Sequence, residues 1–253
     1  MASLRSIRIA GWKSFGEATV TLTPLTVMIG ANGAGKSNFL SLFRLLNVLF
    51  ARMPEFQSYV GKSGYAEALL HYGLGRTPAA ELELDGSRRL PGAELELVFE
   101  TDGGENRYFA QWEPGAGGTL LFKEECIEFL NSGSAAPQVI PLGTGHAESK
   151  LIQAAEDDPT ARTVLWLLRN CRLFHFHDTS ENSAARQPSY VEANRFLYPD
   201  AGNLASMLYL YQGQQAAAYR RITAAVRQMV PDFGDFVLEL SKLNDRQRRR
   251  GKR

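Results

Sequence analysis

Hydrophobic and polar residues alternate near the start of the chain in the manner of short β-strands, at 4–12 and again at 18–22. The next segment, 25–29, reads Leu-Thr-Val-Met-Ile, and its continuous apolar, β-branched content predicts a buried strand. After a glycine-rich stretch, residues 39–50 are apolar on nearly every side, which predicts a helix buried all round.

The middle of the chain predicts an antiparallel sheet. Strand-like runs lie at 81–84, 94–99, 106–112, 119–122 and 126–130. Glycine-rich turns separate them, so we expect a meander with one solvent-facing side. Residues 51–80 are weakly patterned and predict a loop or lid with a short helix at 66–72.

The second half is predicted to be mostly helical. Asp158-Pro159 is a favourable N-cap and first-turn pair for a helix that runs to 168. Asn203 is placed to cap the next helix, and residues 216–230 form another, ended by Pro231. Its predicted buried face carries Ile222, Ala225, Val226 and Met229. Short strands are predicted at 173–177 and 236–240.

One motif carries recognisable chemistry. Residues 30–37 read Gly30-Ala31-Asn32-Gly33-Ala34-Gly35-Lys36-Ser37 and fit the pattern G-x-x-x-x-G-K-[ST]. Such a loop wraps phosphates with successive backbone N–H groups, which requires residues with little or no side chain. Lys36 would place a positive charge on the β- and γ-phosphates, and Ser37 would offer a hydroxyl to Mg²⁺. A predicted strand enters the loop and a predicted helix leaves it, as the motif requires.

The residues around the loop suggest a family. The opening at 4–15, Leu-Arg-Ser-Ile-Arg-Ile-Ala-Gly-Trp-Lys-Ser-Phe, resembles the I-x-x-F-K-S-F opening of SMC-like and RecF-like ATPases. The loop is similar too, with Asn32 at its third position and Asn38 after the serine. The stretches 174–180 and 203–205 resemble those of bacterial AAA-family ATPases of the RecF/SMC/OLD type.

This resemblance implies an α/β P-loop NTPase built like an ABC-type ATPase head. Such a head has a mixed sheet, an antiparallel β subdomain and a helical subdomain. The implied boundaries are 1–240 for the single head, with a P-loop core at 1–50, the β subdomain at 80–130, the helical subdomain at 148–231, and a basic tail at 241–253.

The resemblance also implies the ligands. ATP and Mg²⁺ would be bound by residues 30–38, with Lys36 as the catalytic residue and Ser37 as the metal ligand. Lys13 and Ser14 would lie near the nucleotide. Two heads would sandwich two ATP molecules, so a homodimer or a partner ATPase or effector protein is expected.

Two elements of a complete head are not found. The Walker B motif needs four apolar residues followed by Asp and Glu, and the run at 95–102 is too polar for it. Asp178 ends a short apolar run and is the surrogate candidate, but no acid follows it directly. No L-S-x-G signature occurs. We therefore expect the sequence to represent the N-terminal part of a head, whose hydrolytic acids come from elsewhere.

Other candidate residues favour structural roles. His175 and His177, with Asp178, form a possible metal cluster, but no further protein ligand is evident and a packed polar cluster is the simpler interpretation. His71 and His146 lie in predicted loops, where solvent exposure is expected. Cys171 is expected to be a small core residue, and Tyr209 and Tyr211 are expected to pack within a helix.

The composition limits the classes of protein to which the chain can belong. The chain has 253 residues, of which 44% are hydrophobic and 22% charged, as in soluble globular proteins. It has no apolar run long enough for a membrane helix, no signal peptide and only two cysteines, Cys126 and Cys171, so a cytoplasmic location is expected. Residues 246–253 hold six basic residues, and the rest of the chain has a net charge of −5. The tail is therefore interpreted as a solvated end, as a nucleic-acid contact, or as an out-of-pattern end that does not belong to the fold.

Three hypotheses follow. The first is the ATP-binding part of a RecF/SMC-like ATPase that couples ATP binding and hydrolysis to DNA repair or antiphage defence. The second is an assembly module that binds ATP without hydrolysis and regulates a partner effector. The third, a P-loop kinase, is disfavoured by the antiparallel meander that follows the first helix.

Overall fold

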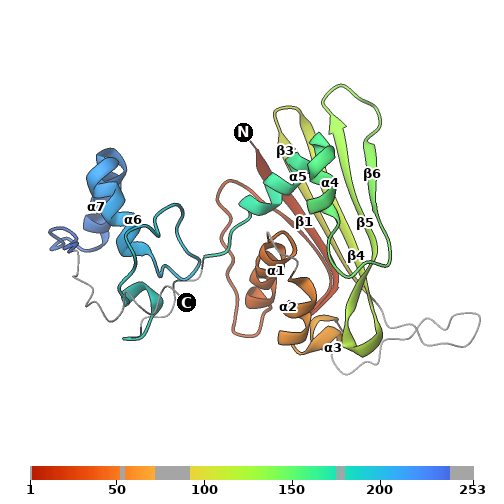
Figure 1. Cartoon of the computed structure of the whole chain (residues 1–253), viewed down its shortest axis with the longest axis horizontal. Coiled ribbons are helices and arrows are strands. Elements are labelled where there is room, and N and C mark those ends of the chain that lie inside the picture. The colour runs from red at the N-terminus through yellow and green to blue at the C-terminus, as the bar shows by residue number, and fades with distance from the viewer. Residues whose placement is uncertain (1, 52–54, 72–91, 175, 177–179, 240–253) are drawn as a thin grey trace, which may run out of the picture. The chain divides into compact units, whose positions relative to one another are not determined.

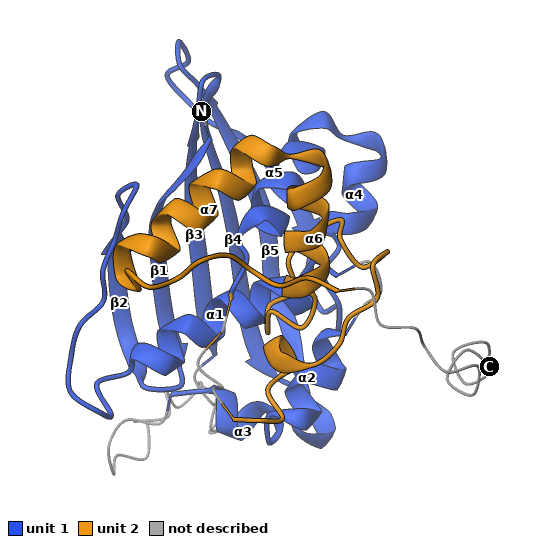
Figure 2. Ribbon diagram, turned by 90° about the vertical axis from the view of Figure 1, so that its left-hand side faces the viewer, with its two compact units in different colours: residues 1–173 blue, residues 174–253 orange. Residues whose placement is uncertain are grey.

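The computed structural model describes residues 2–51, 55–71, 92–174, 176 and 180–239, and the chain divides into two compact units, 1–173 and 174–253 (Figures 1 and 2). The strands are β1 (Ser3–Trp12), β2 (Phe15–Thr21), β3 (Ala93–Thr101), β4 (Gly104–Pro114), β5 (Leu120–Asn131) and β6 (Gln138–Gly143). The helices are α1 (Lys36–Leu49), α2 (Phe56–Lys62), α3 (Tyr65–Leu69), α4 (Leu151–Asp157), α5 (Pro159–Asn170), α6 (Leu204–Gln214) and α7 (Ala216–Met229).

All six strands of the first unit form one sheet in the order β2-β1-β3-β4-β5-β6, and every neighbouring pair is antiparallel. Strand β1 pairs on both sides, so that Ile7 lies opposite Val20 of β2 and Leu97 of β3. The predicted meander is confirmed, although 119–122 and 126–130 merge into β5 and β6 was not predicted. The predicted strand at 81–84 lies outside the described residues.

One face of this sheet forms the core of the first unit. The inward side chains alternate along each strand, as Ile7 and Ile9 do on β1. Helices α1 to α5 contribute buried side chains to the same core and lie on this face (Figure 1). Four aromatic rings, Trp12, Phe56, Trp112 and Phe122, pack with centroids 5.6–6.3 Å apart. The period-two pattern therefore places its apolar half against the helices.

The opposite face of the sheet carries ion pairs, which agrees with the prediction that this face is in contact with solvent. Arg8 bridges Glu17 and Glu94 across three strands, with N–O distances of 3.0 and 2.9 Å. Hydrogen bonds to both carboxylates raise the pKa of Arg8. These partly exposed pairs fix side-chain positions, but each contributes little to the free energy of folding.

Helix α1 connects the glycine-rich stretch to the core, and its existence is confirmed. It buries Phe39, Leu42, Leu45, Leu46 and Leu49. The prediction that it is buried all round is wrong, because the helix lies on a sheet as one layer and its outer side stays in solvent. Leu40, for example, is 39% exposed.

Helices α5, α6 and α7 lie close to their predicted limits, whereas α4 was not predicted as a separate helix. Asp158 caps α5 by accepting a hydrogen bond from the Ala161 N–H at 2.7 Å, with Pro159 in the first turn. Asn203 precedes α6, but its side chain does not cap that helix. Instead it is fully buried, accepts from the Tyr198 N–H and donates to two loop carbonyls.

The predicted buried face of α7 is correct only in part, because two of its four residues are half-buried and two are exposed. Tyr219 and Thr223 are its buried residues, whereas Met229 is 76% exposed. The physical reason is the segment that follows the helix, because the Tyr219 hydroxyl donates to Asp235 and its ring packs against Phe236. The predicted strand at 236–240 does not form in its described part, 236–239, where this contact and not a neighbouring strand holds the chain.

The described part of the weakly patterned region, 51 and 55–71, contains two short helices, α2 and α3, where one was predicted. Of the predicted strand 173–177, the described residues 173, 174 and 176 have no regular secondary structure. Phe174 and Phe176 are 41% and 53% exposed and contact each other.

A buried carboxylate joins the sheet to the start of α4. Glu125 of β5 is 1% exposed and accepts hydrogen bonds from Tyr108 Oη at 2.8 Å, Ser149 Oγ at 2.5 Å and the Lys150 N–H at 2.9 Å. Burial raises the pKa of the Glu125 carboxyl. Three donors converge on one side chain, so removing it leaves buried polar groups without a partner.

We expect Glu125→Ala to lower the free energy of unfolding by about 2–4 kcal/mol, because each unpaired buried donor costs roughly 1–3 kcal/mol and water recovers part of it. Urea denaturation measures the change. The matched control is Glu128→Ala on the same strand, which removes an ion pair to Arg107 on the solvent-facing side and should cost under about 1 kcal/mol. Equal losses in the two variants would contradict the anchoring role of Glu125.

Candidate nucleotide-binding site

The glycine-rich loop lies directly before α1, which begins at Lys36. Gly33 and Gly35 have φ angles of 84° and 90°, in the left-handed region that favours glycine. No side chain caps the helix. The N–H groups of its first turn therefore have no intrahelical acceptor and form an anion-binding end.

The side chain of Lys36 lies back over the loop. Its Nζ donates hydrogen bonds to the carbonyl oxygens of Gly30 at 2.6 Å and Ala31 at 2.7 Å. Within the part of the chain that the structure describes, Lys36 makes no ion pair, so its full positive charge lies beside the uncapped helix start. The loop thus combines a cation, a helix dipole and backbone donors, which is the donor set that a polyphosphate requires.

The turn between β1 and β2 packs against this loop. Asn38 Nδ2 donates to Ser14 Oγ at 2.9 Å, and the rings of Phe15 and Phe39 meet edge to face with centroids 6.4 Å apart. A Cβ atom on Gly35 would lie 3.1 Å from Ser14 Oγ. The structure therefore brings Ser14 together with the loop, as expected from the resemblance.

Lys13 occupies the same turn in an uncommon backbone conformation. Its φ angle is 47°, which costs a residue with a side chain about 1–2 kcal/mol. Its ammonium lies 5.9 Å from the centroid of the Trp12 ring. Partial burial lowers the pKa of Lys13, and the nearby charge of Arg44 lowers it further. The two cations thus lie close enough to repel each other.

His71 was missed as a site residue, and its predicted solvent exposure is wrong. Its Nδ1 lies 2.7 Å from the carbonyl oxygen of Lys13, and its backbone N–H donates to the Gly11 carbonyl. No local sequence signal marks this pairing, because the contact joins residues 58 positions apart. His146 is also not solvated, since its side chain is 9% exposed and its ring stacks on Phe122.

The remaining sequence candidates are two histidines, an aspartate and the two cysteines. His175, His177 and Asp178 lie outside the described residues. Cys126 is buried and Cys171 half-buried, and burial raises the pKa of each thiol to about 11, as expected of packed and unreactive cysteines. Among the residues that the structure places, no group of three or more His, Cys, Asp or Glu side chains could hold a metal ion.

The segment that enters the loop departs from prediction. Residues 25–29 were expected to form a buried strand, but they have no regular secondary structure. Leu25, Val27 and Ile29 are 82%, 72% and 88% exposed. The physical reason is that a strand needs a neighbour, and none of the described strands pairs with this segment. The hydrophobic segment that enters the glycine-rich loop is therefore unpaired within the described part of the chain.

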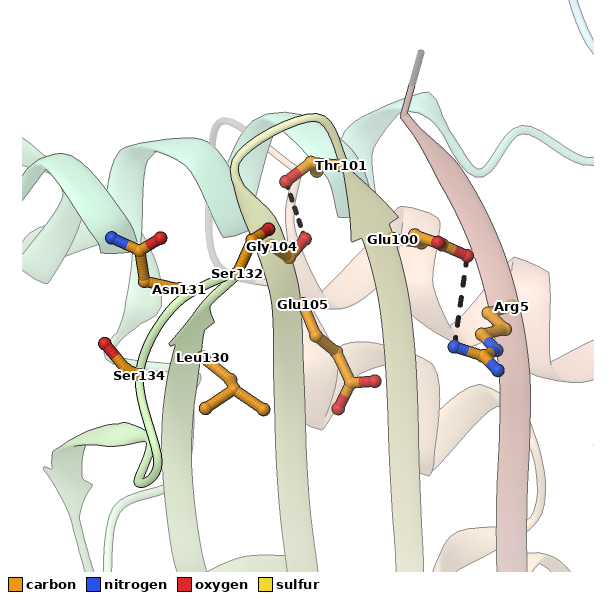
Figure 3. Close-up of a pocket in the computed structure, with 9 residues that line it drawn as sticks. All are labelled: Arg5, Glu100, Thr101, Gly104, Glu105, Leu130, Asn131, Ser132 and Ser134. Carbon is orange, nitrogen blue, oxygen red and sulfur yellow. Dashed lines mark hydrogen bonds and ion pairs between the residues drawn. The ribbon is translucent and has the colours of Figure 1, made fainter.

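A polar hollow of about 300 Å³ lies at the other end of β1 (Figure 3). It is lined by Arg5, Glu100, Thr101, Gly104, Glu105, Leu130, Asn131, Ser132 and Ser134. Arg5 and Ser14 are nine residues apart on an extended hairpin, or roughly 30 Å. The hollow is therefore separate from the glycine-rich loop.

Glycine-rich backbone at an uncapped helix start, under a lysine ammonium, is the phosphate-binding device of P-loop NTPases, and the first unit carries it on an α/β scaffold. A family model described as "AAA domain, putative AbiEii toxin, Type IV TA system" matches residues 25–230, about four fifths of the chain. The chain belongs to this family of AAA-type ATPase domains. The α/β P-loop fold class predicted from sequence is thereby confirmed.

Other comparisons are more distant. A solved structure from a study of "ATP-driven dimerization and DNA stimulated activation of SMC ATPases" is 13% identical over 64% of this chain and 96% of its own, with a TM-score of 0.32. That score is too low to define a shared arrangement. The comparison with curated proteins found no match. Among the described residues, no helix is both long and apolar enough to span a membrane.

We expect Gly35→Ala to destabilise the first unit by about 2 kcal/mol. The alanine would have to adopt a left-handed φ, and its methyl group would lie 3.1 Å from Ser14 Oγ. Thermal unfolding measures the loss. Gly61→Ala is the control, because no atom lies within 4 Å of its added Cβ and it is in a helix. It should be neutral or stabilising by up to about 1 kcal/mol. Similar effects in both variants would disprove close packing at Gly35.

Proposed function

We propose that this chain binds Mg-ATP through residues 30–38. The observation that carries the proposal is the position of the Lys36 ammonium, hydrogen-bonded to two carbonyls of a loop whose glycines adopt left-handed φ angles. That arrangement concentrates positive potential where backbone N–H groups are unpaired. A triphosphate would compete for the ammonium and would satisfy those N–H groups.

Each loop residue has a distinct proposed role. Lys36 exchanges its carbonyl contacts for the β- and γ-phosphates, and Ser37 offers its exposed hydroxyl to Mg²⁺. Asn38 holds Ser14 and so keeps the hairpin turn on the loop. The nucleotide, when bound, supplies a phosphoanhydride bond, and Mg²⁺ neutralises the charge that develops on its phosphates.

Hydrolysis also needs an acid that holds the metal shell and a base that orients water. The described residues provide no carboxylate cluster for this, and Asp178 is not described. We propose that these acids belong to strands that pair with the unpaired segment 25–29. A segment that is apolar on both faces is typical of a strand inside a covered sheet. A second copy of the chain or a partner ATPase would supply such strands.

The coupled activity is proposed as DNA repair or antiphage defence by a RecF/SMC-like ATPase. The defence role is favoured by the family's description, which names a toxin of a type IV toxin–antitoxin system. A direct DNA contact has less support, because the chain without residues 246–253 has a net charge of −5.

The second candidate function is a nucleotide-gated assembly module that binds ATP without hydrolysis and regulates a partner effector. The observation that favours it is the same lack of a metal-binding carboxylate cluster among the described residues. Under this second hypothesis, binding of the triphosphate orders the loop and segment 25–29, and the ordered segment then binds the partner.

We expect Lys36→Ala to weaken Mg-ATP binding roughly ten- to hundredfold, because the variant loses a charge-assisted contact to phosphate. Isothermal titration calorimetry measures the affinity. Lys62→Ala is the matched control, since Lys62 is exposed at the end of α2. Unchanged affinity in Lys36→Ala would refute the proposed site.

Phosphate release from Mg-ATP by the same proteins separates the two candidate functions. Turnover that Lys36→Ala abolishes would favour the ATPase, and Asp178 would then be the first acid to mutate. Binding without turnover would favour the assembly module.

We expect Val27→Lys to leave the free energy of unfolding of the isolated chain within about 0.5 kcal/mol, because Val27 is 72% exposed. The same change should prevent assembly in Mg-ATP, since pairing would bury a charge. Light scattering reports the mass, and Thr19→Lys, at an exposed position of β2, is the control. A stability loss of several kcal/mol would mean that segment 25–29 packs within the chain.

A further inference from the structure

Three contacts link the end of α3 and the residues after it to the hairpin turn, and His71 makes two of them. The Lys13 N–H donates to the Leu69 carbonyl at 2.8 Å, and the His71 N–H donates to the Gly11 carbonyl at 2.9 Å. The third contact is made by the side chain, whose Nδ1 lies 2.7 Å from the Lys13 carbonyl oxygen. The backbone bonds place His71 beside the turn, and the imidazole adds a directional bond to it.

The acceptor in this contact determines which ring nitrogen of His71 carries the hydrogen. A carbonyl oxygen only accepts hydrogen bonds, so Nδ1 must carry the hydrogen and donate it. The acceptor belongs to Lys13, whose φ angle of 47° is unfavourable for a residue with a side chain. The bond therefore stabilises a backbone conformation that the turn would otherwise resist.

The same turn packs against the proposed phosphate-binding loop. Ser14, the residue after Lys13, accepts from Asn38 of α1. Phe15 packs on Phe39, and its ring lies 3.5 Å from the position of a Cβ on Gly35. A shift of the turn would thus move or release groups that contact both Gly35 and the first turn of α1.

We propose that His71 is a positioning residue of the phosphate-binding loop, acting through the Lys13 carbonyl and the Ser14–Asn38 contact. It touches neither the loop nor, by this proposal, the nucleotide. Its effect on nucleotide affinity rests on the proposed ATP-binding function, whereas its effect on the order of the loop does not. The two effects are measured separately.

Two substitutions isolate the hydrogen bond. His71→Asn keeps an N–H donor the same number of bonds from Cα as Nδ1, and His71→Leu keeps apolar bulk without a donor. His146→Leu is the matched control, because His146 Nδ1 also contacts a carbonyl, at 2.8 Å on Glu148, and its ring packs on Phe122. Neither of these His146 contacts involves the loop.

The first measurement is amide hydrogen exchange in the nucleotide-free chain at Ala34 of the loop and Phe39 of α1, whose N–H groups donate to the carbonyls of Ala31 and Gly35. We expect His71→Leu to speed exchange about fivefold, the equivalent of one ordinary hydrogen bond, and His71→Asn to restore most of the protection. His146→Leu should leave exchange in the loop unchanged even where it lowers overall stability. Equal acceleration by both leucine variants, or no rescue by asparagine, would overturn the proposal.

The second measurement is Mg-ATP affinity, with His71→Leu expected to weaken binding about fivefold. The double variant with Asn38→Ala should weaken affinity by less than the product of the two single fold-changes, because both residues act through Ser14. Full additivity would overturn the proposed route. If wild type binds no ATP, the proposed function fails, while the exchange data still decide the role of His71.

Discussion

Strand β1 is the constraint on which the first unit depends, because it is paired on both sides and leads into the turn that packs against the glycine-rich loop. Its inward side chains, Ile7 and Ile9, are 1% exposed and lie in the core, and its outward Arg8 bridges the neighbouring strands. Its register with β2 and β3 fixes where the turn at Lys13 and Ser14 lies. A shift of one residue would exchange the two faces of β1 and move that turn.

Helix α1 transmits this constraint to the site. Its C-terminal two-thirds bury leucines in the core, while its first turn supplies the N–H groups for an anion. The contacts at Phe15 and Phe39 and at Ser14 and Asn38 fasten this first turn to the hairpin. Packing thus holds the N-terminus of α1 in place, so its unpaired N–H donors are already positioned before any ligand binds.

Local patterns predicted the elements whose determinants are local. The loop at 30–37, the Asp158 cap and the alternation on β3 and β4 each depend on nearby residues, and all three formed as expected. The misses at His71, His146 and the buried face of α7 share a different cause. Each depends on a partner distant in sequence or on a later segment, and hydrophobic periodicity carries no information about such contacts.

Segment 25–29 is the most informative miss, because its sequence is that of a covered strand and its environment is solvent. Exposing Leu25, Val27 and Ile29 forgoes the burial of three large apolar side chains, each worth about 1.5–3 kcal/mol when fully buried. A neighbouring strand that paired with segment 25–29 would recover that free energy. The paired segment would then end at Gly30, whose carbonyl oxygen accepts a hydrogen bond from Lys36. Nucleotide binding and sheet completion would therefore act on the same few residues, so each would favour the other.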